Sequence, residues 1–185
     1  MDRTALLGDA PEVGPRLLGT LLVSTVGGTR VSGRIVEVEA YRQDDPASHS
    51  FRGPTDRNRV MFGPPGHLYV YLSYGVHRCA NVVTGPAGAG QALLLRAVAP
   101  VEGRDTMRER RGGRRDAELA DGPGKLCQAF GIELHHSGLD VCSSSSPIVL
   151  VDDGAGSAAP AQVVTGPRIG ITKAVDTPWR FRLRG

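Results

Sequence analysis

Side chains able to carry or hold protons recur at every second position of one short stretch. Residues 33–41 (GRIVEVEAY) place Glu37, Glu39 and Tyr41 two residues apart. If this stretch is a β-strand, the three side chains share one face, and neighbours on that face are about 6.6 Å apart. Two carboxylates at such a spacing would suit an inverting hydrolysis of a glycosidic bond, with one acid and one base.

The other residues of the stretch predict a strand with one apolar face. Val36, Val38 and Ala40 point to one side, and Ile35 lies with the carboxylates on the other. An ordinary half-exposed strand of an antiparallel sheet shows the same alternation. The stretch is therefore a candidate site only if other segments bring functional side chains to it.

Tyrosines gather in a second stretch, although aromatic residues make up only 5% of the chain. Residues 67–72 predict a strand with Tyr69 and Tyr71 on one face, and residues 78–83 predict its return. Tyr74 then lies near the tip of this hairpin. An exposed aromatic gains nothing from burial, so Tyr74 is packed by another segment or contacts a partner.

A lone arginine interrupts the most apolar strand, residues 92–98. Buried arginine is rarely unpaired, so Arg96 is expected to meet Glu39 or Glu37 if this strand is central. The alternative is that Arg96 lies near the strand end and reaches water.

Two further segments carry positive charge. The polar segment 42–65 shows no sustained period and contains His49 and Arg57, and loops of this length are usually functional. Residues 121–126 open a helix whose N-terminal amides, with Lys125, would suit a phosphate. A plain helix start with a surface lysine explains Lys125 equally well.

Composition sets broad limits. The 185 residues are 40% hydrophobic and 22% charged, with net charge +3 and pI near 9.0, which fits a soluble protein and points only weakly to a polyanionic partner. Three separated cysteines form neither a disulfide framework nor a zinc pattern. With no leader-like start and no apolar run of membrane length, a cytoplasmic location is expected.

The remaining pattern predicts short elements around these strands. A helix over residues 9–18 ends at Gly19, a strand follows over 21–24, and Gly27-Gly28 turns the chain into the acidic strand. A second helix is expected from Pro100 through Met107, and a third from residue 121 with Leu126, Ala129 and Phe130 inward. Further strands are expected at 148–151, 168–171 and 179–183, and loops at 143–146 and 154–160.

The ordered motifs resemble the 3-methyladenine (alkyladenine) DNA glycosylases over nearly the whole chain. The resemblance is carried by residues 33–41 (GRIVEVEAY), 47–49 (ASH), 57–62 (RNRVMF), 68–75 (LYVYLSYG), 79–81 (CAN), 93–97 (LLLRA), 122–126 (GPGKL) and 167–170 (PRIG). It implies an α+β fold: a single compact domain over residues 1–185, with a mostly antiparallel curved sheet, flanking helices and a protruding hairpin.

The resemblance implies hydrolysis of the bond between a damaged purine and deoxyribose. Glu39 would be the general base for the attacking water, which Arg96 and the backbone carbonyl of Ile169 would help to hold. A nearby guanidinium keeps such a carboxylate ionised. Glu37 has no such role in the family and is interpreted as structural.

The resemblance also implies a pocket for a base flipped out of the duplex. Tyr41 and Tyr71 would stack on the base, His49 would donate a hydrogen bond to its edge, and the Ala47 carbonyl would read it. Asn81 would crowd the 2-amino group of guanine and so exclude a normal purine.

Tyr74 would intercalate in place of the everted base, and Arg57 and Lys125 would contact the DNA backbone. The expected partner is double-stranded DNA with a damaged purine, such as 3-methyladenine, hypoxanthine or ethenoadenine. The expected enzyme is a monomer without cofactor, metal or lyase activity, because neither lysine lies in a matched catalytic motif.

Two alternatives remain open. A non-catalytic nucleic-acid-binding module would keep the pocket and the wedge without chemistry, and a sugar hydrolase would use Glu37 and Glu39 as its acid and base. Arg42-Gln43 and Arg78 depart from the expected pattern and leave the pocket shape and the range of lesions undecided.

Overall fold

The computed structural model describes residues 1–154 and 160–184; the loop expected over residues 154–160 falls outside them apart from its two ends. The α-helices are α1 (Ala10–Leu17), α2 (Arg104–Arg110) and α3 (Pro123–Phe130). The strands are β1 (Leu21–Ser24), β2 (Val31–Tyr41), β3 (Leu68–Ser73), β4 (His77–Thr84), β5 (Gln91–Glu102), β6 (Ile148–Val151), β7 (Val163–Gly166) and β8 (Arg180–Leu183). Short 3₁₀ turns occur at Arg3–Leu6, Val26–Gly28, Arg59–Phe62, Asp116–Glu118, Leu134–His136 and Pro160–Gln162.

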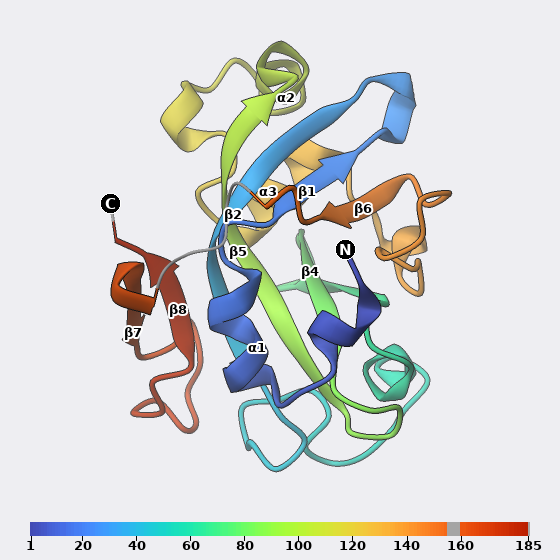
Figure 1. The fold of residues 1–185 in the computed structure, drawn as a ribbon, viewed down its shortest axis with the longest axis vertical. Helices are drawn as coiled ribbons and strands as arrows, with labels where there is room; N and C mark the ends of the chain where they lie inside the picture. Colours follow the sequence, from blue (N-terminus) through green and yellow to red (C-terminus); the bar gives the residue numbers. More distant parts are fainter. Residues whose placement is uncertain (155–159, 185) are drawn as a thin grey trace.

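One antiparallel sheet organises these elements, in the order β3-β4-β5-β2-β1-β6. The long strand β2 pairs with β5 along one edge, and its other edge is shared between β1 and β8. Figure 1 shows β4, β5 and β2 side by side through the middle of the molecule, with β7 and β8 beside β2 at the C-terminal end. The expected α+β fold with a mostly antiparallel curved sheet is confirmed.

Strand β2 carries a bulge that changes the predicted alternation of its side chains. Its register against β5 shifts around Glu37, so that Val36 and Arg96 fall between paired positions. A bulge inserts an extra residue and turns the strand, which breaks the period of two. Ile35 therefore packs in the main core with Val38 and Ala40. The expectation that Ile35 lies on the acidic face was wrong, and Val36, expected on the apolar face, falls in the bulge and is only half-buried.

Helices α1 and α3 cover the apolar face of the sheet. Helix α1 packs on β2 and β5, and α3 packs on β4 and β5, both within the same core cluster. Gly14 of α1 lies so close to β8 that an added Cβ would stand 2.7 Å from the ring of Phe181. The prediction that Leu126, Ala129 and Phe130 face inward is confirmed, because all three are buried.

Two predicted elements differ from the structure. Pro100 lies within β5, which continues to Glu102, and helix α2 begins only after Gly103, whose φ is 74°. Residues 168–171, which were expected to form a strand, form a loop. The strand in this region is β7, whose four residues pair with β8. A proline can open a helix but also fits a strand position that donates no hydrogen bond, and a short apolar run next to glycine is equally ambiguous in a sequence.

The expected protruding hairpin is formed by β3 and β4. Tyr74 and Gly75 link them, with φ values of 51° and 72°, and the Val76 N–H donates to the Ser73 carbonyl at 3.2 Å. Positive φ at both central positions is the requirement of a type I′ turn, which glycine and asparagine normally fill.

No helix in the described ranges is long and apolar enough to cross a membrane.

Candidate active site

Glu39 is the most enclosed charged group of the acidic face. Its side chain has no exposed surface, and three donors surround its two oxygens. The Ile169 N–H donates to Oε1 at 2.8 Å, the Tyr41 hydroxyl donates to Oε2 at 2.9 Å, and Arg96 Nη1 lies 3.3 Å from Oε2. The two hydrogen bonds fix the orientation of the carboxylate, and Arg96 places a positive charge beside it.

Arg96 joins Glu39 to a second carboxylate on the same strand. Arg96 Nε donates to Glu37 Oε1 at 2.8 Å, and Arg180 Nε donates to the same oxygen at 2.7 Å. Burial raises the pKa of Glu37, but the hydrogen bonds and charges of Arg180 and Arg96 outweigh burial, so the pKa lies below its ordinary value. Glu37 thereby holds Arg96 beside Glu39. Both sequence-predicted partners of Arg96 are present.

Tyr41 covers Glu39 from the side of the adjacent cavity. Burial raises the pKa of the Tyr41 hydroxyl, and the negative charge of Glu39 and their hydrogen bond raise it further. The phenol therefore stays protonated and donates to Glu39 throughout the ordinary pH range. Because Tyr41 also lines the cavity, any molecule that stacks on its ring lies close to Glu39.

A cavity of about 570 Å³ opens beside this acidic centre. Nine of the side chains expected at the site line it: Tyr41, Ala47, His49, Arg57, Tyr71, Tyr74, Asn81, Arg96 and Ile169. They come from β2, the loop after it, the β3–β4 hairpin, β5 and the loop before β8. A volume of this size is ordinary for a small-molecule site and accommodates a purine. Of the expected residues, Glu39 lies behind the wall and Lys125 lies elsewhere.

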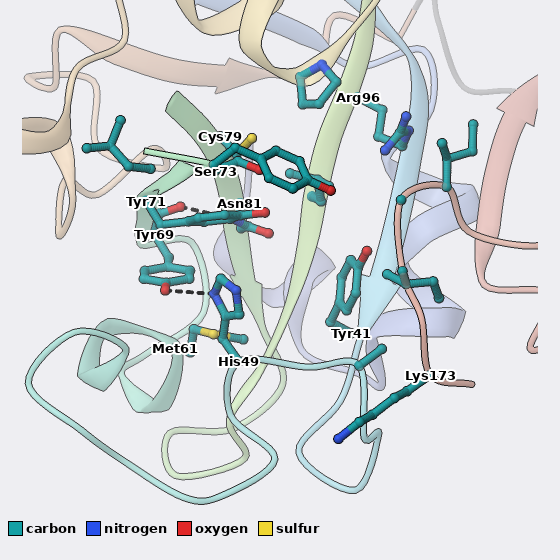
Figure 2. Close-up of a pocket in the computed structure, with 18 of the residues that line it drawn as sticks. Tyr41, His49, Met61, Tyr69, Tyr71, Ser73, Cys79, Asn81, Arg96 and Lys173 are labelled. Carbon is teal, nitrogen blue, oxygen red and sulfur yellow. Dashed lines mark hydrogen bonds between the residues drawn. The ribbon is translucent and has the colours of Figure 1, made fainter. Parts of the chain in front are cut away.

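One wall of the cavity is aromatic. Tyr69 and Tyr71, expected on one face of their strand, are stacked with ring centres 5.7 Å apart, and the His49 ring meets Tyr71 edge-on at 4.5 Å. Figure 2 shows this group facing Tyr41 across the cavity. An opening between tyrosine rings from two strands is suited to a flat aromatic ligand.

His49 is held in the wall by its ring and its backbone. Its Nδ1 lies 3.0 Å from the Tyr69 hydroxyl, and its carbonyl accepts a hydrogen bond from Asn58 Nδ2 at 2.8 Å. Burial lowers the pKa of His49, and the charge of Arg57 lowers it further. The imidazole is therefore neutral at neutral pH. Its Nε2 is then the nitrogen left to face a ligand.

Asn81 lies at the base of the aromatic wall. Its Nδ2 donates to the Tyr69 carbonyl at 3.1 Å, and the residue is buried. This bond, drawn in Figure 2, fixes the side-chain amide within the cavity lining. A fixed amide can clash with, or leave unpaired, a group of a wrongly shaped ligand.

The remaining expected residues differ in their surroundings. Tyr74 is 86% exposed at the hairpin tip. The Arg57 guanidinium lies 6.0 Å from the centre of the Tyr71 ring and so belongs to the cavity wall. Lys125 is paired with Asp121 at 3.0 Å, away from the cavity. Contact of Arg57 or Lys125 with a DNA backbone stays a prediction.

Sequence reasoning missed several residues of this site. Tyr69 holds His49, Arg180 holds Glu37, and Lys173 lies at the cavity rim. Arg168, which precedes Ile169, makes a buried ion pair with Asp45. The sequence does contain a signal for Arg168, because a guanidinium beside an apolar run needs an acidic partner if it is buried. It contains no signal for Asp45, which lies in a polar loop without a regular pattern.

The described part of the chain contains no cluster of three or more His, Cys, Asp or Glu side chains placed to bind a metal ion. Its cysteines, Cys79, Cys127 and Cys142, are not bridged.

Comparison with known proteins identifies the family. The sequence profile of the methylpurine-DNA glycosylase (MPG) family matches residues 4–185. A protein of Nitrosospira multiformis is 53% identical over 175 residues, which are 94% of this chain and 85% of the relative. One of Rhodopseudomonas palustris is 51% identical over 175 residues (94% and 82%), and one of Methanoculleus marisnigri is 51% identical over 184 residues (96% and 91%).

All three relatives carry the provisional name 3-methyladenine DNA glycosylase. The resemblance noted in the sequence is thus confirmed, and with it a DNA-repair enzyme that hydrolyses N-glycosidic bonds and has DNA as its partner. The chain belongs to the methylpurine-DNA glycosylase family.

Proposed function

We propose that the protein flips alkylated or deaminated purines out of duplex DNA and hydrolyses their N-glycosidic bond with a water activated by Glu39. The substrate class is that of 3-methyladenine, hypoxanthine and ethenoadenine. The whole chain, residues 1–185, acts as one monomeric glycosylase domain in the cytoplasm. The reaction uses no metal or cofactor.

One observation carries this proposal: a buried carboxylate with three donors stands directly behind a cavity that fits a purine. An ionised carboxylate accepts about four hydrogen bonds. Two are taken by the Ile169 N–H and the Tyr41 hydroxyl, and Arg96 Nη1 lies 3.3 Å from Oε2 as an ion pair. An acceptor position therefore remains for the proton of a water molecule that enters from the cavity once Tyr41 moves aside.

The chemical step follows from this arrangement. Glu39 takes a proton from the water, whose oxygen bonds to C1′ of the deoxyribose while the bond to the purine nitrogen breaks and its electron pair leaves with the base. The developing oxocarbenium charge of the sugar is stabilised by the nearby carboxylate. Arg96 and the carbonyl of Ile169 hold the water in line.

The cavity walls supply recognition in this proposal. Tyr41 and Tyr71 stack on the two faces of the everted base, which favours electron-poor, damaged purines. Neutral His49 donates from Nε2 to the base edge, and the Ala47 carbonyl accepts from it. Asn81 excludes a purine that carries a 2-amino group.

The surface outside the cavity supplies the grip on DNA. Tyr74 enters the stack that the base has left, and its exposure at a strained turn supports this role. Arg57 and Lys125 contact backbone phosphates. The reaction ends at the abasic site: we propose no lyase step, since that step needs an amine that attacks the sugar.

The test is a single-turnover assay on a duplex with one central hypoxanthine or ethenoadenine. Release of the free base, leaving an abasic site whose strand is cut only after alkali, supports the proposal. Tight, salt-sensitive binding without release would favour a binding module, and no salt-sensitive DNA binding would favour a sugar hydrolase. Covalent trapping with borohydride would reveal a lyase, and Lys173→Gln would then test the lysine at the rim.

A further inference from the structure

An ion pair outside the cavity has no part in the proposed chemistry. The side chains of Arg168 and Asp45 are 0% and 1% exposed. Arg168 Nη2 donates to Asp45 Oδ1 at 3.1 Å, and Nη1 donates to Asp45 Oδ2 and to the Ala40 carbonyl of β2, the latter at 2.9 Å. The loss of hydration when an ion pair is buried can cost as much free energy as the attraction between its charges returns, so a buried pair is weak evidence for stabilisation of the fold. The groups that this pair holds in place indicate its role more directly.

Asp45 shapes the turn that leads into the cavity wall. Its Oδ1 accepts from the Ala47 N–H at 3.0 Å, and its carbonyl accepts from the Ser48 N–H at 2.9 Å. Ala47 and His49 on either side of Ser48 both line the cavity. One carboxylate thus joins Arg168 to the turn that presents two proposed base contacts.

Arg168 reaches the other wall. Its guanidinium carbon lies 4.6 Å from the centre of the Tyr41 ring and 5.3 Å from that of Trp179. Arg168 does not line the cavity, so it contacts the Tyr41 ring from outside. The neighbouring Ile169 N–H is the donor to Glu39 Oε1. Two of the three donors to Glu39 therefore belong to groups that Arg168 contacts or directly precedes.

The loop that carries Ile169 has few other attachments. Within the described chain, hydrogen bonds from residues 167–173 to other segments come from the Arg168 side chain and the Ile169 N–H. Residues 169–173 all line the cavity. If Arg168 loses its partners, the Ile169 N–H makes the one hydrogen bond that remains, among the described residues, between this loop and β2.

We propose that the Asp45–Arg168 pair is a positioning unit of the active site: it holds the Ile169 N–H and the Tyr41 ring against Glu39 and sets the turn before His49. The inference rests on the proposed role of Glu39 as the base. Neither residue touches the substrate in this account. Their effect on catalysis passes through the donors that surround Glu39.

The consequence appears in the rate of the chemical step. The charged or titratable groups that face Glu39 are Tyr41 and Glu37 on β2, Arg96 on β5, Arg180 on β8, and Tyr71 on β3, with the uncharged Ile169 N–H from the loop. A displaced Ile169 N–H leaves one oxygen of Glu39 without its hydrogen bond, so the carboxylate is no longer fixed in the orientation that faces the water. The chemical step then slows.

The experiment compares two variants with the parent enzyme. Asp45→Asn combined with Arg168→Gln keeps hydrogen-bonding groups and removes both charges together, and Arg168→Lys keeps the charge but not the paired bonds. Arg3→Gln is the control, since Arg3 also pairs with an aspartate, Asp140, far from the cavity. Single-turnover release of hypoxanthine is measured at saturating enzyme, and folding is followed by thermal unfolding.

The double variant is expected to fold and to release hypoxanthine about 100-fold more slowly. Arg168→Lys is expected to restore part of this rate, and Arg3→Gln to match the parent's rate. A folded double variant with the parent's rate overturns the inference; should it not fold, a folded Arg168→Lys protein with the parent's rate does so. The Glu39→Gln variant distinguishes a failure of this inference from a failure of the proposed function. An active Glu39→Gln enzyme would show that Glu39 is not the general base, whereas an inactive one leaves the proposed function standing.

Discussion

Replacement of Arg96 by glutamine tests how much of the chemistry depends on one guanidinium. Arg96 is the only cation of the described residues that contacts both carboxylates, at 2.8 Å from Glu37 and 3.3 Å from Glu39. Glutamine can keep a hydrogen bond to one of them but carries no charge. The fold should tolerate the change, because Glu37 keeps Arg180 and Glu39 keeps the Tyr41 hydroxyl and the Ile169 N–H.

The size of the effect follows from these contacts. A hydrogen bond to a charged group contributes about 1.5–3 kcal/mol net. If that interaction serves the transition state, its loss slows the chemical step about 10- to 150-fold, at 1.36 kcal/mol for each tenfold change. Stability should fall by less than the ~3–5 kcal/mol typical of a buried pair broken outright, since neither carboxylate is left alone.

The assay is single-turnover release of hypoxanthine from a duplex, with unfolding monitored in parallel. Arg34→Gln is the matched control: Arg34 lies on β2, the strand that carries both carboxylates, and pairs with Asp153 near the surface, away from Glu39. It should keep the parent's rate. A folded Arg96→Gln enzyme that releases the base within threefold of the parent's rate would refute the reasoning, since Arg96 would then support neither the carboxylate nor the water.

Three further predictions concern other parts of the site. Tyr74→Gly should leave the melting temperature unchanged or raise it, because Tyr74 is 86% exposed at a φ of 51°. Because the variant lacks the wedge, it should slow the release of a damaged base from a duplex more than the release of a base that is already looped out. An equal loss of rate on both substrates would contradict this prediction. Arg57→Gln should raise the pKa of His49, because the charge of Arg57 is one of the two causes that lower it. NMR titration of the imidazole measures this pKa, and an unchanged value in the variant would contradict the prediction. The pKa of Glu37 in the folded protein lies below its ordinary value. Its contribution to stability is therefore present at pH values above the ordinary pKa and is lost as the pH falls through the lowered pKa. Glu37→Gln should flatten the loss of melting temperature in acid, and an acid profile identical to the parent's would contradict this prediction.

The acidic strand and the tyrosine hairpin were predictable because their patterns are local. Alternation over residues 33–41 and 67–72 places Glu39, Tyr41 and Tyr71 on defined faces. Arg96 was predictable for a different reason: a guanidinium inside an apolar strand requires an acid, and both available carboxylates lie on the neighbouring strand.

Features that depend on contacts distant in the sequence were not predictable. The bulge that turns Ile35 into the core arises from the register of β2 against β5, which the sequence of β2 alone does not determine. The Asp45–Arg168 pair joins residues 123 positions apart, and only the fold brings them together. The enclosure of Glu39 by Tyr41 and the Ile169 N–H has the same origin.

The helix expected at Pro100 shows a limit of local signals. Proline commonly opens a helix, but it also fits a strand position that donates no hydrogen bond, and β5 continues past it to Glu102. The choice between the two depends on whether β2 extends far enough to pair with it, and Gly33 of β2 does pair with Pro100.

The central claim is that Glu39 activates the water that cleaves the glycosidic bond. Glu39→Gln keeps the size of the side chain and one oxygen that can accept from the Ile169 N–H while removing the base, and Glu12→Gln on the exposed face of α1 is the matched control. In single-turnover assays on a hypoxanthine duplex, Glu39→Gln should bind as tightly as the parent and release no measurable base, and Glu12→Gln should match the parent in both. Release by folded Glu39→Gln near the parental rate would contradict the claim.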